Sequence, residues 1–373
     1  MSPTEVSIII PCYNAEDYVR EAIESVLSQE RSAQIIVVDD GSTDNTLQIL
    51  SYFSSDIQIL QSEHKGVAVA RNKAIEFVRS RYALLLDADD ALAPGALDSL
   101  LRRASNSDSI VVYGNFSSWD SLMSKKQNYH KTPRFLNDPL SLLVQRNISP
   151  PGAILFSSDA FEKVGDFDQS VAACEDWDFI VRLARAGYCF KYVNKEVFYY
   201  RRIRSSASNQ ANRMLSSGLE VVHRCHRKDI RIKEDLFPDG YRRNDLENNL
   251  FYYYAVCMGL ASLSDDADCV KEIIQSIKLP PTPDWRKFGN AYRLSLWWNS
   301  LAIVGNKEDI ICNAQINCVQ SINELFEEEI WCKEMAMSII SPDFRQLIFR
   351  PGPKKALRLY REFKLAKKII EKM

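Results

Sequence analysis

The first 113 residues of this 373-residue chain alternate short apolar runs with amphipathic segments, and short polar joins separate them. Four of the apolar runs have the length and composition of strands buried on both faces of a sheet, at residues 6–10, 34–38, 57–60 and 82–86. The segments between them repeat apolar residues at helical spacing, so each can cover the sheet with one face. This alternation predicts an α/β fold, a mainly parallel sheet with flanking helices.

The fourth apolar run ends abruptly in three carboxylates, Asp87, Asp89 and Asp90. Open α/β sheets bind ligands at the carboxyl ends of their strands, which is where these residues fall. Asp87 and Asp89 are two apart, so in an extended chain their side chains point the same way, an arrangement that suits a hard divalent cation bridging to phosphate. The structural alternative is a solvated acidic turn before a helix that begins near Pro94.

The composition is that of an ordinary globular protein, with 46% hydrophobic and 26% charged residues. The formal net charge of −2 argues against a nucleic-acid binder, for which a strongly basic balance is expected. Nine cysteines occur without a Cys-x-x-Cys pair, and a strand pattern starts within six residues of the N-terminus. We therefore expect no signal peptide, reduced thiols and a cytoplasmic location. No apolar run reaches the ~18 residues that a membrane-spanning helix needs.

The middle of the chain is less regular. Residues 114–147 are Ser-rich and poorly patterned, which predicts a long loop with one short helix near residues 139–145. A strand is expected at residues 153–156. Asp159 followed by Glu162 is a capping-box pattern, which predicts the start of a short helix.

A second acidic cluster, Cys174-Glu175-Asp176-Trp177-Asp178, opens an amphipathic segment that is expected to form a helix ending at Gly187. Acidic residues in a first turn are stabilised by the helix dipole, so this cluster has a purely structural interpretation. From about residue 207 onward the pattern is helix after helix. We expect an α/β domain at residues 1–208 and a helical C-terminal domain at residues 209–373.

Five motifs in this order resemble those of the family 2 inverting glycosyltransferases with the GT-A fold: VSIIIPCYNAEDYVREAIESVLSQ, VVDDGSTDNT, HKGVAVARNKAI, LLLDADDAL and CEDWDF. The resemblance covers residues 5–208. It implies the nucleotide-diphospho-sugar transferase fold and transfer of a sugar from a nucleotide-sugar, most commonly a UDP-sugar, to an acceptor hydroxyl with inversion. It also implies a divalent metal, Mn²⁺ or Mg²⁺.

The resemblance assigns several positions to the nucleotide. An ionised Asp40 is an acceptor only, which suits a base edge with N–H donors such as uracil or guanine. The family places this residue against the base, with the Pro11–Asn14 turn, including Tyr13, packed beside it. Arg71 can meet diphosphate oxygens through its planar fork, and Asp87 is assigned to the nucleotide as well. The alternatives are turn capping for Asp40 and an exposed helix cation for Arg71.

The reaction itself needs a metal and a base. Asp89 matches the position that holds the metal, which neutralises the leaving diphosphate as a Lewis acid. Asp176 matches the base that accepts the proton of the attacking hydroxyl. Glu175 and Trp177 are expected to contact donor or acceptor, although Trp177 also fits as a core aromatic. One base without a carboxylate nucleophile implies a single displacement.

The sequence departs from the family in the segment that follows the expected catalytic base Asp176. Many members have a histidine there, and this chain has Ile203. A third protein ligand to the metal is therefore in doubt, and Arg202 or Arg204 is expected to contact the diphosphate instead. A zinc site made by His223, Cys225 and His226 is disfavoured, because their spacing matches no standard site and a fourth ligand is missing.

Two other classes remain as alternatives. A nucleotidyltransferase of related fold would need a Gly-rich, basic phosphate loop after the first strand, and Pro11-Cys12-Tyr13-Asn14 is neither. A non-catalytic nucleotide-sugar-binding scaffold would not need Asp40, Asp89 and Asp176 together. A dinucleotide dehydrogenase is excluded because no G-x-G-x-x-G follows a strand.

The acceptor we expect is a lipid-linked or growing glycan of bacterial surface-polysaccharide assembly. Residues 354–372 have an apolar stripe flanked by eight Lys and Arg residues, which is typical of a helix lying on an anionic membrane surface. Such a helix would place the enzyme peripherally on the inner face of the cell membrane. Packing of this helix on its own protein or on a second subunit is the alternative.

Overall fold

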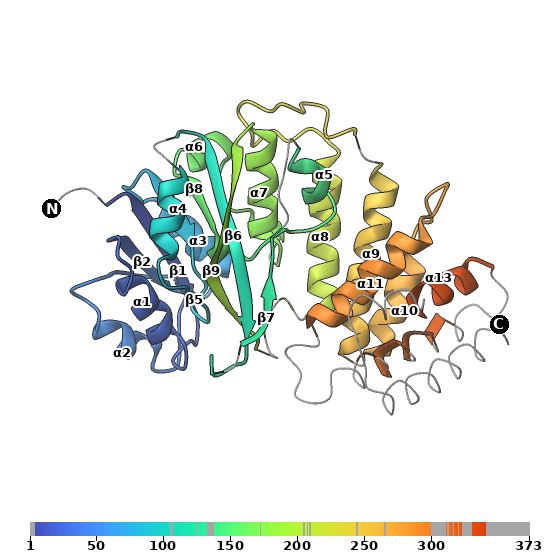
Figure 1. Cartoon of the computed structure of the whole chain (residues 1–373), viewed down its shortest axis with the longest axis horizontal. Helices are drawn as coiled ribbons and strands as arrows, with labels where there is room; N and C mark the ends of the chain where they lie inside the picture. Colours follow the sequence, from blue (N-terminus) through green and yellow to red (C-terminus); the bar gives the residue numbers. More distant parts are fainter. Residues whose placement is uncertain are drawn as a thin grey trace. The chain divides into compact units, whose positions relative to one another are not determined.

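A computed structural model describes residues 4–340 of the chain, apart from residues 105–106, 125, 133–137, 172, 204–205, 207, 209, 244, 265, 300–310, 312, 316, 320 and 323–329. These residues fall into two compact units, and the chain passes between them more than once (Figure 1). The first unit comprises Met1–Arg202 and His223–Arg242, and the second comprises Ile203–Val222 and Arg243–Met373.

The four strands predicted from the apolar runs form one half of the sheet in the first unit, with boundaries within two residues of those expected. They are β1 (Val6–Cys12), β2 (Gln34–Asp39), β3 (Gln58–Gln61) and β4 (Tyr82–Leu85), in the spatial order β3-β2-β1-β4. All neighbouring pairs among them are parallel. The connecting helices are α1 (Val19–Leu27), α2 (Thr46–Ser51) and α3 (Val67–Ile75). The carboxyl ends of these strands therefore meet at one edge, as predicted.

The other half of the sheet is where the prediction of a long loop at residues 114–147 is wrong. The order continues as β8-β6-β9-β5, with β7 beside β6. The strands are β5 (Ala91–Leu92), β6 (Ile110–Trp119), β7 (Lys126–His130), β8 (Ile154–Ser157) and β9 (Cys189–Arg201). Strand β6 pairs in parallel with β9 and antiparallel with β7 and β8, so the whole sheet is mixed.

Side-chain hydrogen bonds explain how the polar residues of β6 can be buried. The amide of Asn115 donates to the Tyr129 hydroxyl at 2.7 Å and accepts from the Tyr192 hydroxyl at 2.7 Å. Ser118 lies 2.6 Å from the imidazole of His130. Buried polar groups are tolerated when they are paired in this way. A Ser-rich strand therefore forms where strand propensity alone is weak.

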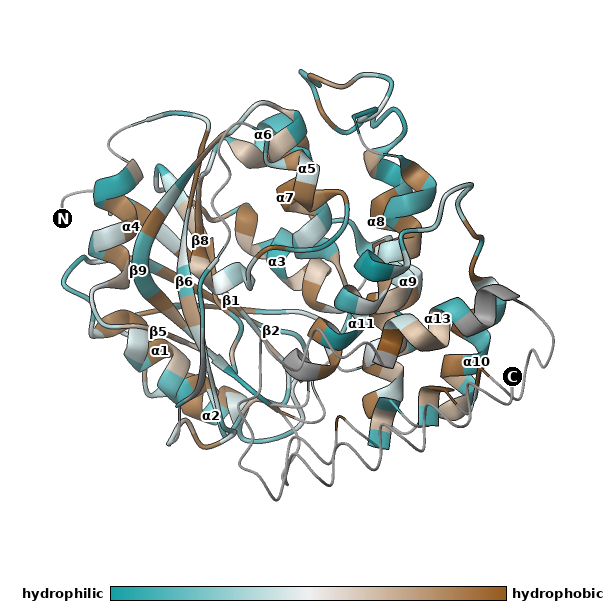
Figure 2. Ribbon diagram, turned by 45° about the vertical axis from the view of Figure 1, so that its right-hand side comes forward, coloured by the Kyte–Doolittle hydropathy of each residue, from teal (hydrophilic) through white to brown (hydrophobic). Residues whose placement is uncertain are grey.

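Helices of the first unit cover the sheet and close its loops. They are α4 (Ala96–Ala104), α5 (Leu140–Leu143), α6 (Ala160–Val164) and α7 (Glu175–Arg185). Figure 2 shows hydrophobic and hydrophilic faces on α4, whose apolar side chains are buried. Gly165 ends α6 at φ 76°, but the predicted capping box is absent. The Asp159 carboxylate instead accepts from the Tyr188 hydroxyl and pairs with Lys163, both at 2.8 Å.

The second unit is helical in its described part. Its helices are α8 (Ala211–Cys225, to Val222 in this unit), α9 (Leu246–Leu263), α10 (Ala267–Ser276), α11 (Trp285–Asn299) and α13 (Ile330–Ile340). Helices α9 and α11 pack closely at Gly259, where an added Cβ would lie 2.6 Å from the Tyr292 carbonyl oxygen. None of the described helices has the length and apolar character needed to cross a bilayer. The basic segment at residues 354–372 lies outside the described residues.

Candidate active site

The turn after β4 carries three carboxylates in different environments. The Asp90 N–H donates to the Asp87 carbonyl at 3.1 Å, which closes the turn. The Asp90 carboxylate is 1% exposed and accepts from the Arg201 N–H at 2.7 Å. Burial, with Asp89 and Asp87 nearby, raises the pKa of Asp90 well above its usual range. Asp90 is therefore a structural carboxylate, whereas Asp87 and Asp89 are half-buried at the edge of the sheet.

Arg201, at the end of β9, holds the main chain of this turn. Its Nε donates to the Asp89 carbonyl at 2.5 Å, and its two terminal nitrogens donate to the Ser121 carbonyl at 2.7 Å and the Glu21 carboxylate at 2.5 Å. The guanidinium thus holds the Asp89 main chain, and its positive charge also lowers the pKa of the Asp89 carboxyl group. Within the described part of the chain the Asp89 carboxylate forms no ion pair.

The chemistry of Asp89 fits a metal ligand. Burial, followed by repulsion from Asp87, raises the pKa of Asp89 to about 6, and a bound cation would relieve both effects. No group of three His, Cys, Asp or Glu side chains among the described residues could hold a metal ion, and Ile203 offers no ligand atom. Mg²⁺-type sites commonly use one or two carboxylates and complete the shell with substrate phosphates and water. Asp89 would hold the cation in a site of this kind.

Arg71 of α3 connects this turn to the first turn of α7. Its terminal nitrogens donate to the Asp87 carboxylate at 2.7 Å and to the Glu175 carboxylate at 2.5 Å. The Arg71 side chain is 2% exposed. Arg71 and Glu175 are thus buried and paired with each other, and contact of Arg71 with the diphosphate or of Glu175 with donor or acceptor stays a prediction. Burial and the neighbouring Asp176 raise the pKa of Glu175 to about 7, and Arg71 opposes that rise.

Asp176, the predicted base, lies in this same first turn. Its Oδ2 accepts from the Asn147 side-chain amide at 2.9 Å, and its Oδ1 accepts from the Trp177 N–H at 2.7 Å. Burial raises the pKa of Asp176, with Asp87 adding to the effect and Arg71 opposing it. The pKa of this carboxyl group is thus shifted toward neutral pH, as is common for a general base.

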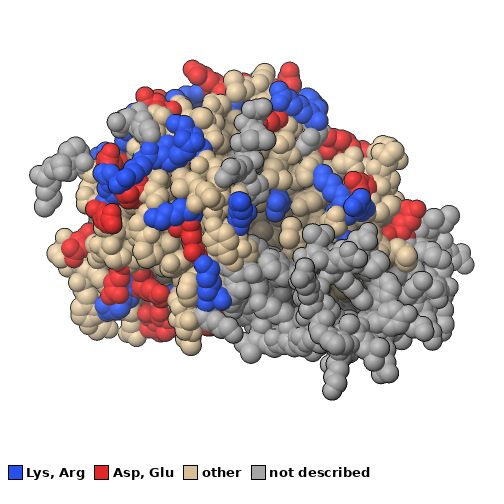
Figure 3. All heavy atoms as spheres, viewed as in Figure 1, with Lys and Arg blue, Asp and Glu red and all other residues tan. Residues whose placement is uncertain are grey.

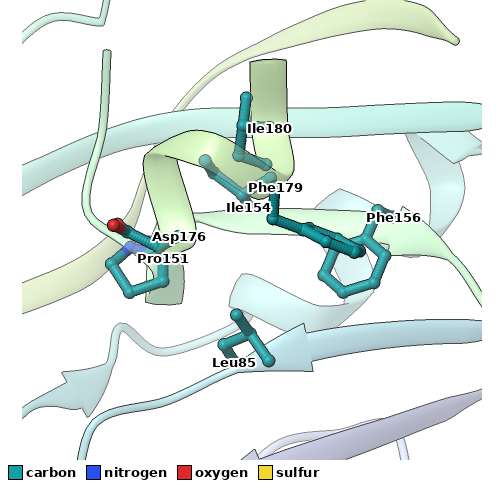
Figure 4. A pocket seen from close by; sticks show the side chains of 7 residues that line it. All are labelled: Leu85, Pro151, Ile154, Phe156, Asp176, Phe179 and Ile180. Carbon is teal, nitrogen blue, oxygen red and sulfur yellow. The ribbon is translucent and has the colours of Figure 1, made fainter. Parts of the chain in front are cut away.

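A small apolar pocket lies against one side of Asp176 (Figure 4). Its other lining residues are Leu85, Pro151, Ile154, Phe156, Phe179 and Ile180. The apolar walls explain the desolvation of the carboxyl group. Trp177 points elsewhere: it is 2% exposed and its Nε1 donates to the Leu143 carbonyl at 2.7 Å. This burial favours the interpretation of Trp177 as a core aromatic, and its contact with donor or acceptor stays a prediction.

The residues assigned to the nucleotide base gather at the ends of β1 and β2. Asp40 is 4% exposed, and its two carboxylate oxygens accept from the N–H groups of Lys65 at 3.0 Å and Gly66 at 2.7 Å. Gly66 has φ 95°, a conformation that glycine adopts readily. In this structure Asp40 therefore fixes the loop before α3. Each of its oxygens can still accept a further hydrogen bond.

The turn after β1 lies beside this carboxylate. The Tyr13 ring stacks on the His64 ring with 3.9 Å between centroids, and both side chains are exposed. The Asn14 side chain accepts from the Thr43 N–H at 2.8 Å, which joins the turns after β1 and β2. Pro11 lies within β1 opposite Val38.

Of the two arginines expected at the diphosphate, Arg202 is among the described residues. Arg202 is 4% exposed, its guanidinium lies 5.3 Å from the centre of the Tyr200 ring, and burial lowers its pKa. Its contact with the diphosphate stays a prediction, and Arg204 lies outside the described residues. Sequence reasoning also missed Arg201 and Asn147. The alternation of β9 could have shown Arg201, but Asn147 has no local signal because it lies in an irregular segment.

Residues 7–165 match the model of glycosyl transferase family 2, so the resemblance is confirmed over this segment. An uncharacterized glycosyltransferase of Rickettsia prowazekii, RP339, is 32% identical over 209 residues, which cover 54% of this chain and 64% of that protein. The chain spans less than two thirds of the length of the curated relatives that it matches first.

Solved structures confirm the fold. S. aureus TarS 1–349 in complex with UDP-GlcNAc superposes with a TM-score of 0.53 at 16% identity, covering 93% of each chain. The mannosyltransferase PcManGT from Pyrobaculum calidifontis, in complex with GDP-Man and Mn²⁺, gives a TM-score of 0.51 at 15% identity, covering 88% of this chain and 89% of that one.

Proposed function

Because residues 7–165 match glycosyl transferase family 2, we propose that this chain transfers a sugar from a nucleotide-sugar to an acceptor hydroxyl with inversion. The observation that carries the proposal is the pair of hydrogen bonds made by Arg71, at 2.7 Å to Asp87 and 2.5 Å to Glu175. They bring the turn of Asp89 and the first turn of α7 to one edge of the sheet. This proximity supports the proposal that the residues assigned to metal and base act in one site.

The chain's own groups have separate tasks in this mechanism. A divalent cation, Mn²⁺ or Mg²⁺, held by Asp89 would act as a Lewis acid toward the leaving diphosphate. Asp176 accepts the proton of the attacking hydroxyl, for which its raised pKa is favourable. The neighbouring Glu175 is paired with Arg71 and does not act as a nucleophile. A single displacement follows, which inverts the configuration at the anomeric carbon of the transferred sugar.

The donor we propose is a UDP-sugar. Asp40 offers acceptor oxygens at the ends of β1 and β2, and uracil and guanine both present an N–H donor. The two similar structures carry UDP-GlcNAc and GDP-Man, which supports a nucleotide-sugar. The acceptor we propose is a lipid-linked or growing glycan at the inner face of the cell membrane. Positive and negative side chains are interspersed on the described part of the face in Figure 3.

The test is a thermal-shift and turnover screen of UDP- and GDP-sugars with and without Mn²⁺. We expect one donor to raise the Tm with Mn²⁺ and to be consumed, since a ligand that binds the native state stabilises it. Asp89→Asn should remove most of this turnover and keep the fold. Asp108→Asn is the matched control, because Asp108 is 85% exposed on the first unit.

Two outcomes would contradict the proposal. Metal-dependent turnover that survives in Asp89→Asn would remove the metal assignment. Nucleotide-sugar binding without any consumption would favour the non-catalytic scaffold, and formation of a nucleotide-sugar from a sugar phosphate would favour a nucleotidyltransferase.

A further inference from the structure

The end of α5 and the irregular segment that follows it are attached to the first turn of α7 by one hydrogen bond each. The Trp177 Nε1–H donates to the Leu143 carbonyl at 2.7 Å, and the Asn147 Nδ2–H donates to Asp176 Oδ2 at 2.9 Å. The first bond involves a core indole and a main-chain carbonyl. The second ends on the carboxylate to which we assign the proton transfer.

A third contact fixes the orientation of the Asn147 amide. The Ile148 N–H donates to Asn147 Oδ1 at 2.8 Å, so this atom must be the oxygen. Turning the amide around would place its NH₂ group against an N–H and its oxygen against the Asp176 carboxylate, two repulsive contacts. The NH₂ group is therefore held toward Asp176.

The two oxygens of Asp176 each receive one uncharged donor. Oδ2 receives the Asn147 amide at 2.9 Å and Oδ1 receives the Trp177 N–H at 2.7 Å, which together set the plane of the carboxylate. Among the described residues, Asn147 is the side chain that donates to Asp176. Each oxygen still has a free lone-pair direction for a substrate hydroxyl.

The other groups around Asp176 do not supply this donor. The charged neighbours are Arg71 from α3, Asp87 after β4 and Glu175 in α7, and Arg71 is divided between those two carboxylates. The pocket at Asp176 is lined by apolar residues (Figure 4). A neutral amide is a suitable partner here, because it favours the ionised carboxylate without forming an ion pair that would suppress its basicity.

We propose that Asn147 is a positioning residue that orients the Asp176 carboxylate and favours its ionised form. This inference rests on the proposed function, in which Asp176 accepts the hydroxyl proton. Asn147 itself does not exchange a proton with the substrate.

The test is the pH dependence of kcat in Asn147→Leu and Asn147→Asp. Leucine has a similar size and removes the donor. The acidic limb of the profile, where kcat rises as Asp176 loses its proton, should therefore move up by about one pH unit. At pH values below this limb the activity should fall about tenfold, and above it the loss should be smaller. Asn147→Asp puts a second carboxylate beside Asp176 and should move the limb further. KM for the nucleotide-sugar should stay within about twofold. Asn194→Leu, at an exposed position of β9, is the matched control and should leave the limb in place.

A purely structural role for Asn147 would lower activity equally at every pH and leave the limb unmoved, and that result would overturn the inference. Carboxyl ¹³C titration of Asp176, assigned with Asp176→Asn, reads the same pKa without turnover. A wild-type protein inactive with every donor would remove the proposed function, and with it the premise of this inference. Active wild type with an unmoved limb in both Asn147 variants would reject the inference alone.

Discussion

Asp176 and Asp178 lie two residues apart in the first turns of α7, yet their surroundings are opposite. Asp178 is 2% exposed and accepts from three guanidinium groups, at 2.9 Å from Arg182, 3.2 Å from Arg224 and 3.0 Å from Arg231. Asp176 is half-buried and receives an amide and a main-chain N–H. The residue type is the same, but two residues along an α-helix turn the side chain by about 200°. The two carboxylates therefore lie on opposite faces of α7 and meet different partners.

This difference shows how a structural carboxylate can be distinguished from a chemical one. A buried carboxylate surrounded by arginines is saturated, and removing it leaves uncompensated positive charge. A desolvated carboxylate with neutral donors has a raised pKa and can still accept a proton. Asp90 shows that accessibility matters as well: its donor is the main-chain N–H of Arg201 and its pKa is raised, but it is 1% exposed, whereas Asp89 is half-buried.

The largest expected effect is on turnover in Asp176→Asn. We expect transfer to fall by ~10² to 10⁴-fold, because the amide cannot accept the hydroxyl proton. Nucleotide binding should persist, since the residue acts on the acceptor. The measurement is kcat beside the Tm shift produced by the nucleotide-sugar with Mn²⁺. Simultaneous loss of binding and turnover would instead favour a structural role for this turn.

Asp178→Asn should act on stability. Removing the negative charge from the three arginines should lower the free energy of unfolding by about 3 to 5 kcal/mol, as expected when one member of a buried pair is lost. Urea unfolding measures this change. Activity per folded molecule should remain near that of the wild type at low temperature. A tenfold loss in the folded protein would show that the contrast with Asp176 is incomplete.

Asp89→Asn should change stability with a defined pH dependence in the metal-free protein. The pKa of Asp89 is raised from 3.8 to about 6, so the folded state binds the proton more tightly than the unfolded state does. The wild type therefore loses stability as the pH rises from about 4 to 6. The variant avoids this loss and should be more stable by roughly 1 to 3 kcal/mol above pH 6. Equal Tm values for the two proteins at pH 4 and pH 7.5 would contradict the desolvation of Asp89.

Arg231→Lys should have the smallest effect. Arg231 contacts both oxygens of Asp178 at 3.0 Å through its two terminal nitrogens, whereas a lysine offers one point charge. Because Arg182 and Arg224 remain, we expect a loss of about 1 kcal/mol in urea unfolding. A loss as large as that in Asp178→Asn would mean that Arg231 alone compensates this carboxylate.

The sequence predicted the parallel half of the sheet well because each strand there is a continuous apolar run. It missed the part of β6 after residue 113 and the whole of β9, where buried polar residues depend on partners far away in the chain, such as Asn115 with Tyr192. Local periodicity carries no trace of such pairs.

The sequence predicted which motifs belong to the site, but it could not predict which of their side chains are buried and paired. The motifs that contain Asp89 and Asp176 are connected through Arg71, which bonds to Asp87 and Glu175. Whether Arg71, Arg202 and Trp177 face a ligand or the interior depends on burial, which residue type does not reveal. Asn147 could not be predicted, because its role follows from a contact 29 residues along the chain.

The return of residues 223–242 to the first unit has a consequence for the order in which the protein is made. Arg224 and Arg231, which compensate Asp178, follow a segment that belongs to the second unit. A nascent chain that ends at residue 202 therefore holds the whole sheet but lacks these two cations. Translation at ~5 to 20 residues per second leaves this state in place for several seconds. We expect the ribosome-bound first unit to stay protease-sensitive until residue 242 has emerged, and a fragment ending at residue 208 to be a poor substitute for the complete unit.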